Sequence, residues 1–130
     1  MIRLVPLEKD LKYKKLVSIH LGSNYHIEDG MLLKENDKIV GYTLYKQYNK
    51  DKIYLDWIWA PGYGTLFYKR LENKWKKKYK SIIINVSIDP NENKNKVIRR
   101  LNFWYRMKFI IKNIKYRQKY GPLLIMEKEI

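Results

Sequence analysis

Residues 52–75 decide the fold, and they read KIYLDWIWAPGYGTLFYKRLENKW. The beginning of this stretch alternates in the manner of a strand, with one predicted face formed by Ile53, Leu55, Trp57 and Trp59. Its end has the spacing of an amphipathic helix, whose predicted buried face is Phe67, Tyr68, Leu71 and Trp75. A turn with two glycines separates them. The pattern therefore predicts a strand, a glycine turn and a helix.

The segments around this stretch complete an α/β domain. Ile82-Ile83-Ile84-Asn85-Val86 follows the helix and is apolar enough for a strand buried on both faces, so a βαβ unit is expected. Gly41 interrupts an earlier strand and indicates a bulge or a close backbone approach. We expect one domain over residues 1–130, with further strands at 2–5, 31–35, 38–46, 109–114 and 123–128, a helix over 7–21, and a second helix burying Val97, Leu101, Trp104 and Tyr105.

The glycine turn is the segment with most chemical content. Two glycines allow the backbone to approach a ligand closely, and the first turn of the following helix presents unpaired N–H groups with a partial positive charge. Such amides can hold a pyrophosphate without a cationic side chain, and Thr65 could add a hydroxyl donor. A simple tight turn is the alternative. A Walker loop and a dinucleotide fingerprint are disfavoured, because their glycine and lysine spacings are missing.

The composition limits the classes of function. The chain has 28 basic and 13 acidic residues, a net charge of +15, so polyanions such as nucleic acid, phosphate-rich cofactors or acidic proteins suit its field. The abundance of lysine also fits a low-GC genome. The absence of cysteine excludes disulfides and thiolate catalysis, and His20 and His26 are too few for a three-histidine metal site, so no metal is expected. We expect a cytoplasmic domain, because neither a signal peptide nor a membrane-spanning run is present.

Four segments together resemble the GNAT N-acetyltransferases over essentially the whole chain. Ile39-Val40-Gly41-Tyr42 looks like the third strand of that family, and Leu55-Asp56-Trp57-Ile58-Trp59-Ala60-Pro61 looks like its fourth. Residues 62–72, GYGTLFYKRLE, match its coenzyme-binding motif, and Leu124-Ile125-Met126-Glu127-Lys128 is similar to its closing strand. The resemblance implies a mixed, mostly antiparallel sheet of about six to seven strands, flanked by helices, whose central parallel strands splay apart.

The resemblance also implies an activity and a site. It implies acetyl transfer from acetyl-coenzyme A (acetyl-CoA) to an amine by direct attack on the thioester, with the pantetheine arm lying against the backbone of Trp57, Ile58, Trp59 and Ala60. The pyrophosphate would be held at Gly62, Tyr63, Gly64, Thr65 and Leu66. The acceptor pocket would include the loop residues His26, Glu28 and Asp29. An exposed loop histidine is the alternative for His26.

The catalytic candidates are Asp56 and Tyr105. Asp56 interrupts an apolar strand beside the turn and could accept a proton from the amine, although it could equally face solvent or pair with a lysine. Counting back from Phe109 places Trp104 where the family often has the tyrosine that protonates the leaving thiolate. If the helix were one residue tighter at its end, Tyr105 would occupy that position instead. Trp59 stands where the family usually has Gln or Arg, and Lys108 stands in place of a glycine.

Two hypotheses about function follow. The first is an active acetyltransferase, monomeric or homodimeric, whose acceptor is a neutral small amine, a protein N-terminus or an amine attached to RNA, because a +15 surface repels polycations. The second is a non-catalytic basic module of the same fold that binds RNA or another acidic partner through its basic helix faces. Calorimetry with acetyl-CoA distinguishes them.

Overall fold

The computed structural model describes residues 1–21 and 29–130. In chain order the elements are β1 (Ile2–Pro6), the 3-10 helix η1 (Leu7–Lys9), α1 (Leu11–Leu21), β2 (Asp29–Glu35), β3 (Lys38–Gln47), β4 (Lys52–Trp59), α2 (Gly64–Trp75), β5 (Ser81–Ser87), α3 (Lys94–Arg106), β6 (Ile110–Lys115) and β7 (Leu123–Glu129). Every element expected from the sequence is present. The observed bounds differ from the predicted ones by a few residues. For example, η1 replaces the first turn of the helix predicted over 7–21.

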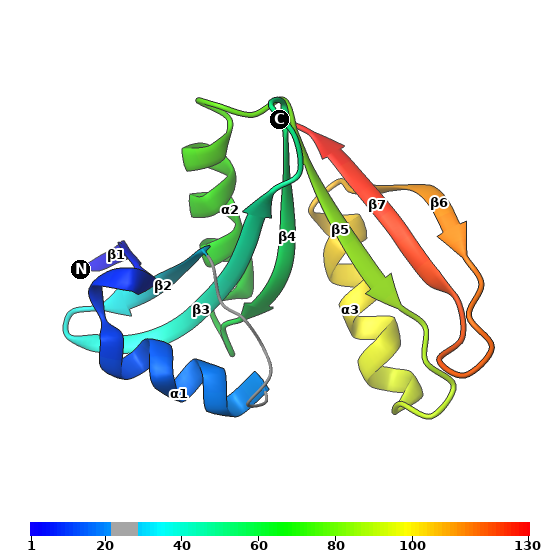
Figure 1. Cartoon of the computed structure of the whole chain (residues 1–130), viewed down its shortest axis with the longest axis horizontal. Helices are drawn as coiled ribbons and strands as arrows, with labels where there is room; N and C mark the ends of the chain where they lie inside the picture. Colours follow the sequence, from blue (N-terminus) through cyan, green and yellow to red (C-terminus); the bar gives the residue numbers. More distant parts are fainter. Residues whose placement is uncertain (22–28) are drawn as a thin grey trace.

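The strands form a single mixed sheet in the order β1-β2-β3-β4-β5-β7-β6. All neighbours are antiparallel except β4 and β5, which are parallel and joined by α2. Figure 1 shows these two strands meeting near the C-terminus and diverging from there, so that the sheet opens like a V. The predicted mixed sheet with splayed parallel strands is confirmed.

Two apolar clusters hold the layers together, one on each face of the sheet. The larger cluster joins α2 and α3 to the central strands, and at its centre the ring of Tyr68 makes edge-on contacts with Trp104 and Phe109 at centroid distances of 5.7 and 5.6 Å. The smaller cluster places Val17 of α1 against Leu32 and Tyr42 on the opposite face. The helices are therefore packed on both faces of the sheet.

Gly41 marks a close approach of β3 to the glycine turn, as expected. A Cβ built on it would lie 2.7 Å from the Cβ of Ala60 and 2.9 Å from the carbonyl oxygen of Trp59. Only glycine accommodates this spacing without movement of the neighbouring backbone. The contact positions the end of β4, and with it the start of α2.

Candidate active site

A cleft lies where β4 and β5 separate. Their backbone pairing covers only three positions, from Lys52 opposite Ser81 to Tyr54 opposite Ile83. Beyond Tyr54 the strands enclose a cavity of about 500 Å³, which is lined by Leu55, Asp56, Trp57, Ile58, Ile84, Asn85, Ser87, Glu92, Arg100 and Trp104. The unpaired edges of two parallel strands thus face a space large enough for an extended ligand arm.

A bulge in β4 produces part of this shape. Leu44 pairs with Trp57 and Tyr45 with Leu55, so the register skips Asp56, which is the extra residue of the bulge. The buried hydroxyl of Thr43 donates to the carbonyl oxygen of Trp57 at 2.6 Å and fixes the bulged backbone. Because the bulge shifts the alternation by one residue, the predicted single face of β4 is wrong beyond Leu55.

The bulge redirects both tryptophans of β4. Ile53 and Leu55 face the large cluster as expected, and Ile58 packs against that cluster after the bulge. Trp59 instead contacts Tyr42 of the smaller cluster, with ring centroids 5.6 Å apart. Trp57 and Trp59 remain 40% and 39% exposed. They flank the end of β4 on the α1 side of the sheet and are not core residues.

Asp56 belongs to a polar network that spans the two strands. The amide nitrogen Nδ2 of Asn85 donates to the hydroxyl of Tyr54 at 3.0 Å, and this hydroxyl interacts with the carboxylate of Asp56. Burial, together with the neighbouring negative charge of Asp56, raises the pKa of Tyr54 to about 12. Tyr54 is therefore protonated at neutral pH and can donate its hydrogen to Asp56 while it accepts one from Asn85.

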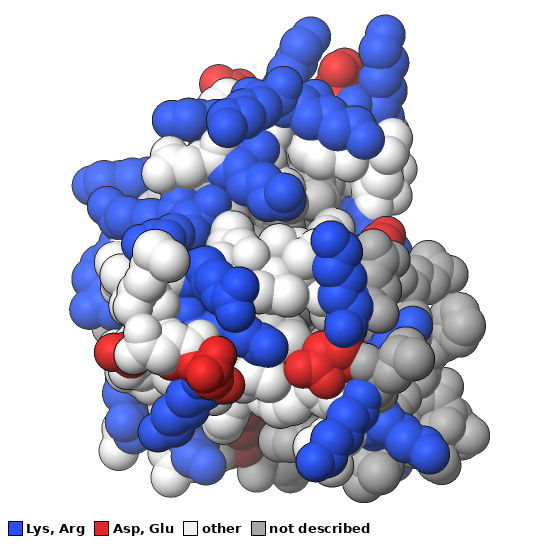
Figure 2. All heavy atoms as spheres, turned by 90° about the vertical axis from the view of Figure 1, so that its left-hand side faces the viewer, with Lys and Arg blue, Asp and Glu red and all other residues white. Residues whose placement is uncertain are grey.

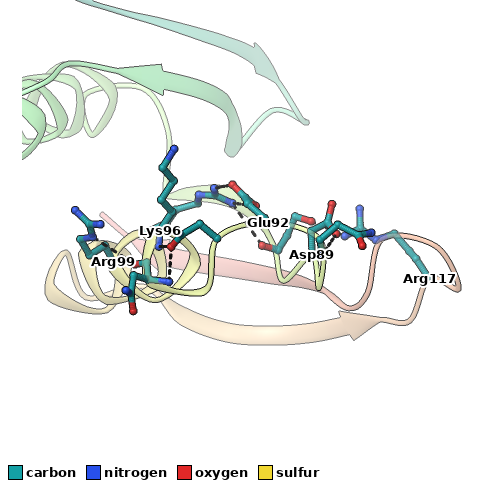
Figure 3. Close-up of polar contacts among 10 residues, drawn as sticks. Asp89, Glu92, Lys96, Arg99 and Arg117 are labelled. Carbon is teal, nitrogen blue, oxygen red and sulfur yellow. Dashed lines mark hydrogen bonds and ion pairs between the residues drawn. The ribbon is translucent and has the colours of Figure 1, made fainter.

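The far wall of the cleft is held by two arginines from different elements. Arg100 of α3 forms an ion pair with Glu92 and lies 3.5 Å from the carbonyl oxygen of Ser87. Figure 3 shows Glu92 among these polar contacts, together with Asp89 and Arg117. Arg117 donates to the hydroxyl of Ser87 at 2.6 Å and to the carbonyl oxygen of Gly121 at 2.9 Å. These contacts fix the end of β5 and the loop that follows it, and they place a paired carboxylate in the cleft.

The start of α2 offers backbone amides, as the glycine turn predicts. Phe67 N–H makes the first intrahelical bond, to the carbonyl oxygen of Tyr63 at 2.8 Å, so the amides of Gly64, Thr65 and Leu66 precede the hydrogen-bonded ladder. Tyr63, the N-cap residue, makes no side-chain capping bond. Gly62 has a φ of 80°, the left-handed conformation that glycine adopts at no steric cost.

One predicted phosphate donor is occupied. The amide of Tyr63 donates to the carbonyl oxygen of Ala60 at 2.9 Å, so it closes the turn and is not available to a ligand. The hydroxyl of Tyr63 is bound to the carboxylate of Glu35, and this hydrogen bond is the main cause of its raised pKa. Tyr63 therefore anchors the turn to the end of β2, and the amides of Gly64, Thr65 and Leu66 remain as candidates.

The C-terminal end of α3 does not tighten by the one residue that would bring Tyr105 to the position of the general acid. Phe109 N–H bonds to Trp104 O and Lys108 N–H to Tyr105 O, both at 3.0 Å, and Lys108 has a φ of 73°. This is a Schellman C-cap with lysine in the glycine position. Trp104 consequently lines the cleft, whereas Tyr105 is 44% exposed and is not among the lining residues. The expectation that Tyr105 faces inward is wrong.

Of the three acceptor-pocket candidates, the structure describes Asp29 alone, and Asp29 does not line the cleft. His26 and Glu28 lie outside the part of the chain that the structure describes. Asp29 is the first residue of β2 and pairs with Tyr45. It lines a separate cavity near the end of α2, together with Trp75 and Lys78.

Sequence reasoning missed the residues that connect the strands. Asn85 interrupts the run Ile82–Val86, a polar residue in a strand that otherwise reads as buried, and this was the available signal for a role at the strand divergence. Tyr54 and Arg100 gave no comparable signal, because tyrosine is common in strands and arginine on helix faces. Within residues 1–21 and 29–130, no cluster of three potential metal ligands occurs, and no helix is long and apolar enough to span a membrane.

Comparisons with known proteins agree with this architecture. No family model matches the chain. A stretch of 79 residues is 33% identical to an uncharacterised N-acetyltransferase of Acanthamoeba polyphaga mimivirus, and the match covers 59% of this chain but only 18% of that protein. The chain thus corresponds to less than a fifth of its curated relative.

Solved structures match over nearly the full length. A GNAT family acetyltransferase from Elizabethkingia anophelis with acetyl-CoA bound is 18% identical, covers 99% of this chain and 98% of its own, and gives a TM-score of 0.69. The ribosomal-protein-S18-alanine N-acetyltransferase from Escherichia coli is 17% identical, and the match covers 100% of this chain and 94% of that protein with a TM-score of 0.69. An N-acetyltransferase from Staphylococcus aureus Mu50 is 13% identical, and the match covers 99% of this chain and 97% of that protein with a TM-score of 0.72. The seven-stranded sheet, its diverging parallel pair and these matches together identify the fold of the chain as that of the GNAT acetyltransferases.

Proposed function

We propose that this chain is an acetyl-CoA-dependent N-acetyltransferase. One observation carries the proposal: the parallel strands β4 and β5 stop pairing after Tyr54 and Ile83, and a cavity of about 500 Å³ opens between them. In support, the structurally similar GNAT family acetyltransferase from Elizabethkingia anophelis was solved with acetyl-CoA bound. The relative from mimivirus is named as an N-acetyltransferase.

The residues present fit the coenzyme. Its pyrophosphate would accept hydrogen bonds from the amides of Gly64, Thr65 and Leu66, where the helix dipole also favours negative charge. Its pantetheine arm would pair with the freed backbone edges of β4, over Trp57 to Ala60, and of β5. The aromatic rings of Phe103 and Trp104 border this path, since a Cβ on Gly64 would lie 3.5 Å from Phe103 and Trp104 lines the cleft.

Acetyl-CoA supplies an activated acyl group as a thioester. The acceptor nitrogen attacks the carbonyl carbon, a C–N bond forms, the C–S bond breaks, and the sulfur leaves as a thiolate that takes up a proton. Asp56 is proposed as the base that removes the proton from the attacking amine, because its carboxylate lines the cleft and is oriented by Tyr54 and Asn85. Backbone amides near Trp59 are proposed to polarise the carbonyl oxygen.

The donor of the thiolate proton stays a prediction from sequence. Tyr105 is the candidate that the family resemblance offers, but its exposed position on α3 provides no contact with the cleft. The acceptor is proposed to be a small neutral amine, a protein N-terminus or an amine attached to RNA, because the net charge of +15 opposes the approach of polycations.

Calorimetry with acetyl-CoA tests the proposal. We expect submillimolar binding by the native chain and at least tenfold weaker binding by Thr65→Glu, which places a carboxylate where the pyrophosphate would lie. Glutamate in the first turn of a helix is compatible with folding, and Thr65 is exposed. Asn73→Glu is the matched control, since it makes the same charge change at an exposed site in the last turn of α2.

Two results would contradict the proposal. The first is no detectable acetyl-CoA binding by the folded native chain, which would favour a non-catalytic basic module. The second is equal loss of affinity in Thr65→Glu and Asn73→Glu, which would indicate a general charge effect. Mass spectrometry of candidate amines incubated with labelled acetyl-CoA then identifies the acceptor, with Asp56→Asn as the variant expected to lose transfer while it keeps coenzyme affinity.

A further inference from the structure

The outer surface of α2 and the turn after it carry an unusual concentration of positive charge. We call this surface the α2 basic face, and it consists of Lys69, Arg70, Lys74, Lys76, Lys77, Lys78 and Lys80, all of them exposed. Figure 2 shows lysine and arginine atoms gathered over the upper part of the side of the molecule on which α2 lies, with few acidic atoms between them. The single acid in the same stretch, Glu72, is half-buried and bound to Lys128 and Tyr68.

Most of this charge is not neutralised within the described residues. Lys80 lies 4.0 Å from the carboxylate of Asp51, and Arg70 donates to the carbonyl oxygen of Ile2 at 2.9 Å. Over residues 1–21 and 29–130, no carboxylate lies within ion-pair distance of Lys69, Lys74, Lys76, Lys77 or Lys78. Like charges held this close repel one another, so an external polyanion would relieve the repulsion.

A second observation narrows the kind of polyanion. The α2 basic face ends at a cavity of about 400 Å³, which is lined by Asp29, Tyr45, Gln47, Ile53, Lys74, Trp75, Lys78 and Tyr79. The rings of Tyr45 and Trp75 are in edge-to-face contact at 5.2 Å, and the hydroxyl of Tyr79 lies 3.4 Å from Oε1 of Gln47. Aromatic surface, an amide and a carboxylate inside a rim of two lysines are groups that contact a nucleobase, and a bare phosphate needs none of them.

The cavity and the proposed active-site cleft are separate. They share no lining residue. The cavity borders the C-terminal end of α2, whose twelve residues place it roughly 18 Å from the amides at the start of the helix. Binding at the basic face therefore leaves the amides of Gly64, Thr65 and Leu66 accessible. A ligand at the basic face would bind whether or not the chain transfers acetyl groups.

We propose that the α2 basic face and the adjoining cavity bind single-stranded nucleic acid, with phosphates along the lysines and one base in the cavity. The part of this face that lies on α2, from Lys69 to Lys74, spans about 8 Å, since successive residues in the helix rise by about 1.5 Å, and the turn after it adds four more lysines. The carboxylate of Asp29 can accept a hydrogen bond from an exocyclic amino group of the base. RNA and DNA strands share this chemistry, and the experiment separates them.

Fluorescence anisotropy with labelled twelve-nucleotide strands of RNA and of DNA tests the proposal. We expect binding whose affinity falls with salt. The triple variant Lys74→Gln, Lys77→Gln, Lys78→Gln is expected to lower affinity at least tenfold and to reduce the slope of log K against log salt by about two. The matched control is Lys94→Gln, Lys112→Gln, Lys115→Gln, which removes the same charge from exposed sites on α3 and β6 and should change affinity little.

The base-binding cavity has its own test. Tyr79→Leu keeps an apolar side chain where Tyr79 packs against the main core but removes the aromatic ring and hydroxyl, and Gln47→Ala removes an exposed amide. Each is expected to weaken strand binding about three- to tenfold without changing the salt slope. Inorganic polyphosphate of equal charge should bind less tightly than the strands and be insensitive to these two substitutions. A preference for RNA over DNA would indicate contacts with the 2′-hydroxyl.

Three outcomes would overturn the proposal. They are equal losses in the test and control triple variants, equal affinity for polyphosphate and for the strands, and binding to vesicles of anionic phospholipid with no binding to either strand. The last outcome would assign the α2 basic face to a membrane surface. Circular dichroism of each variant confirms that the chain is folded, so that a loss of affinity is not caused by unfolding.

Discussion

Asn85 and Tyr54 bridge β5 and β4 by a hydrogen bond of 3.0 Å at the point where the backbone pairing of the two strands ends. The last backbone pair is Tyr54 with Ile83, so the side-chain bond takes the place of the ladder at the apex of the V. It also orients the hydroxyl of Tyr54 toward Asp56. One tyrosine thus connects the opening of the cleft to the proposed base.

The Tyr54→Phe variant is expected to change how stability responds to high pH. The folded pKa of Tyr54 is about 12 and the unfolded value is about 10, so the folded chain holds the proton more tightly. The stabilising contribution of protonated Tyr54 to the free energy of unfolding is fully present below pH 10 and is lost as pH rises from 10 to 12. We expect the stability of the native chain relative to Tyr54→Phe to fall by about 1 kcal/mol over that window, after discounting for solvent screening.

Urea unfolding of both proteins at pH 8, 10, 11 and 12 measures this difference. Tyr116→Phe serves as the control, because Tyr116 is 84% exposed and its substitution should give parallel curves at all pH values. If the curves of the native chain and of Tyr54→Phe also run parallel, the hydroxyl of Tyr54 is not held by its neighbours as the structure indicates.

Substitutions of the two catalytic candidates are expected to give opposite results. Asp56→Asn removes the proposed base and should reduce kcat by about 10²- to 10⁴-fold with little change in acetyl-CoA affinity. Tyr105→Phe should leave kcat nearly unchanged, because Tyr105 is exposed and Trp104 occupies the cleft. Steady-state kinetics with the acceptor found by mass spectrometry checks both. A large loss of kcat in Tyr105→Phe alone would return the acid role to Tyr105.

Local sequence signals predicted most of the fold. Alternation, helical spacing and the glycine turn predicted the elements, since each of these features is encoded within a few neighbouring residues. The divergence of the parallel strands was implied by the family resemblance alone. They did not predict that Trp57 and Trp59 would leave the core, because a one-residue bulge at Asp56 has no side-chain signature of its own. The orientation of every later residue in β4 depends on this bulge.

The candidate site was predictable only in its backbone part. The amides of Gly64, Thr65 and Leu66 follow from the turn and the start of the helix, both of which are local. The bond between Tyr54 and Asn85 joins residues 31 positions apart, and it depends on the distance at which two strands diverge. The ion pair of Arg100 with Glu92 likewise depends on the path of a loop that no local pattern specifies.

Gly41→Ala is expected to destabilise the fold by about 1 to 3 kcal/mol. The added methyl group would lie 2.7 Å from the Cβ of Ala60 and 2.9 Å from the carbonyl oxygen of Trp59, so backbone must move. Gly64→Ala is the matched control, because its Cβ would be in ordinary contact with Phe103 at 3.5 Å. Urea unfolding compares the two. Equal stability in both variants would contradict the close approach of β3 to the glycine turn.

Lys108→Gly is expected to stabilise the chain by about 0.5 to 1 kcal/mol. Lys108 occupies the left-handed position of the C-cap of α3 with a φ of 73°, where a side chain costs about 1 to 2 kcal/mol and glycine costs nothing. The greater freedom of glycine in the unfolded chain offsets part of the gain.

The control for this prediction is Lys108→Ala, which removes the same charge and the same long side chain but keeps the Cβ in the strained conformation. If the gain comes from backbone strain, thermal unfolding should give a higher Tm for Lys108→Gly and no increase for Lys108→Ala. Equal increases in both variants would instead assign the effect to relief of charge repulsion on a chain of net charge +15. A fall in Tm for Lys108→Gly would mean that α3 does not end in the C-cap described above.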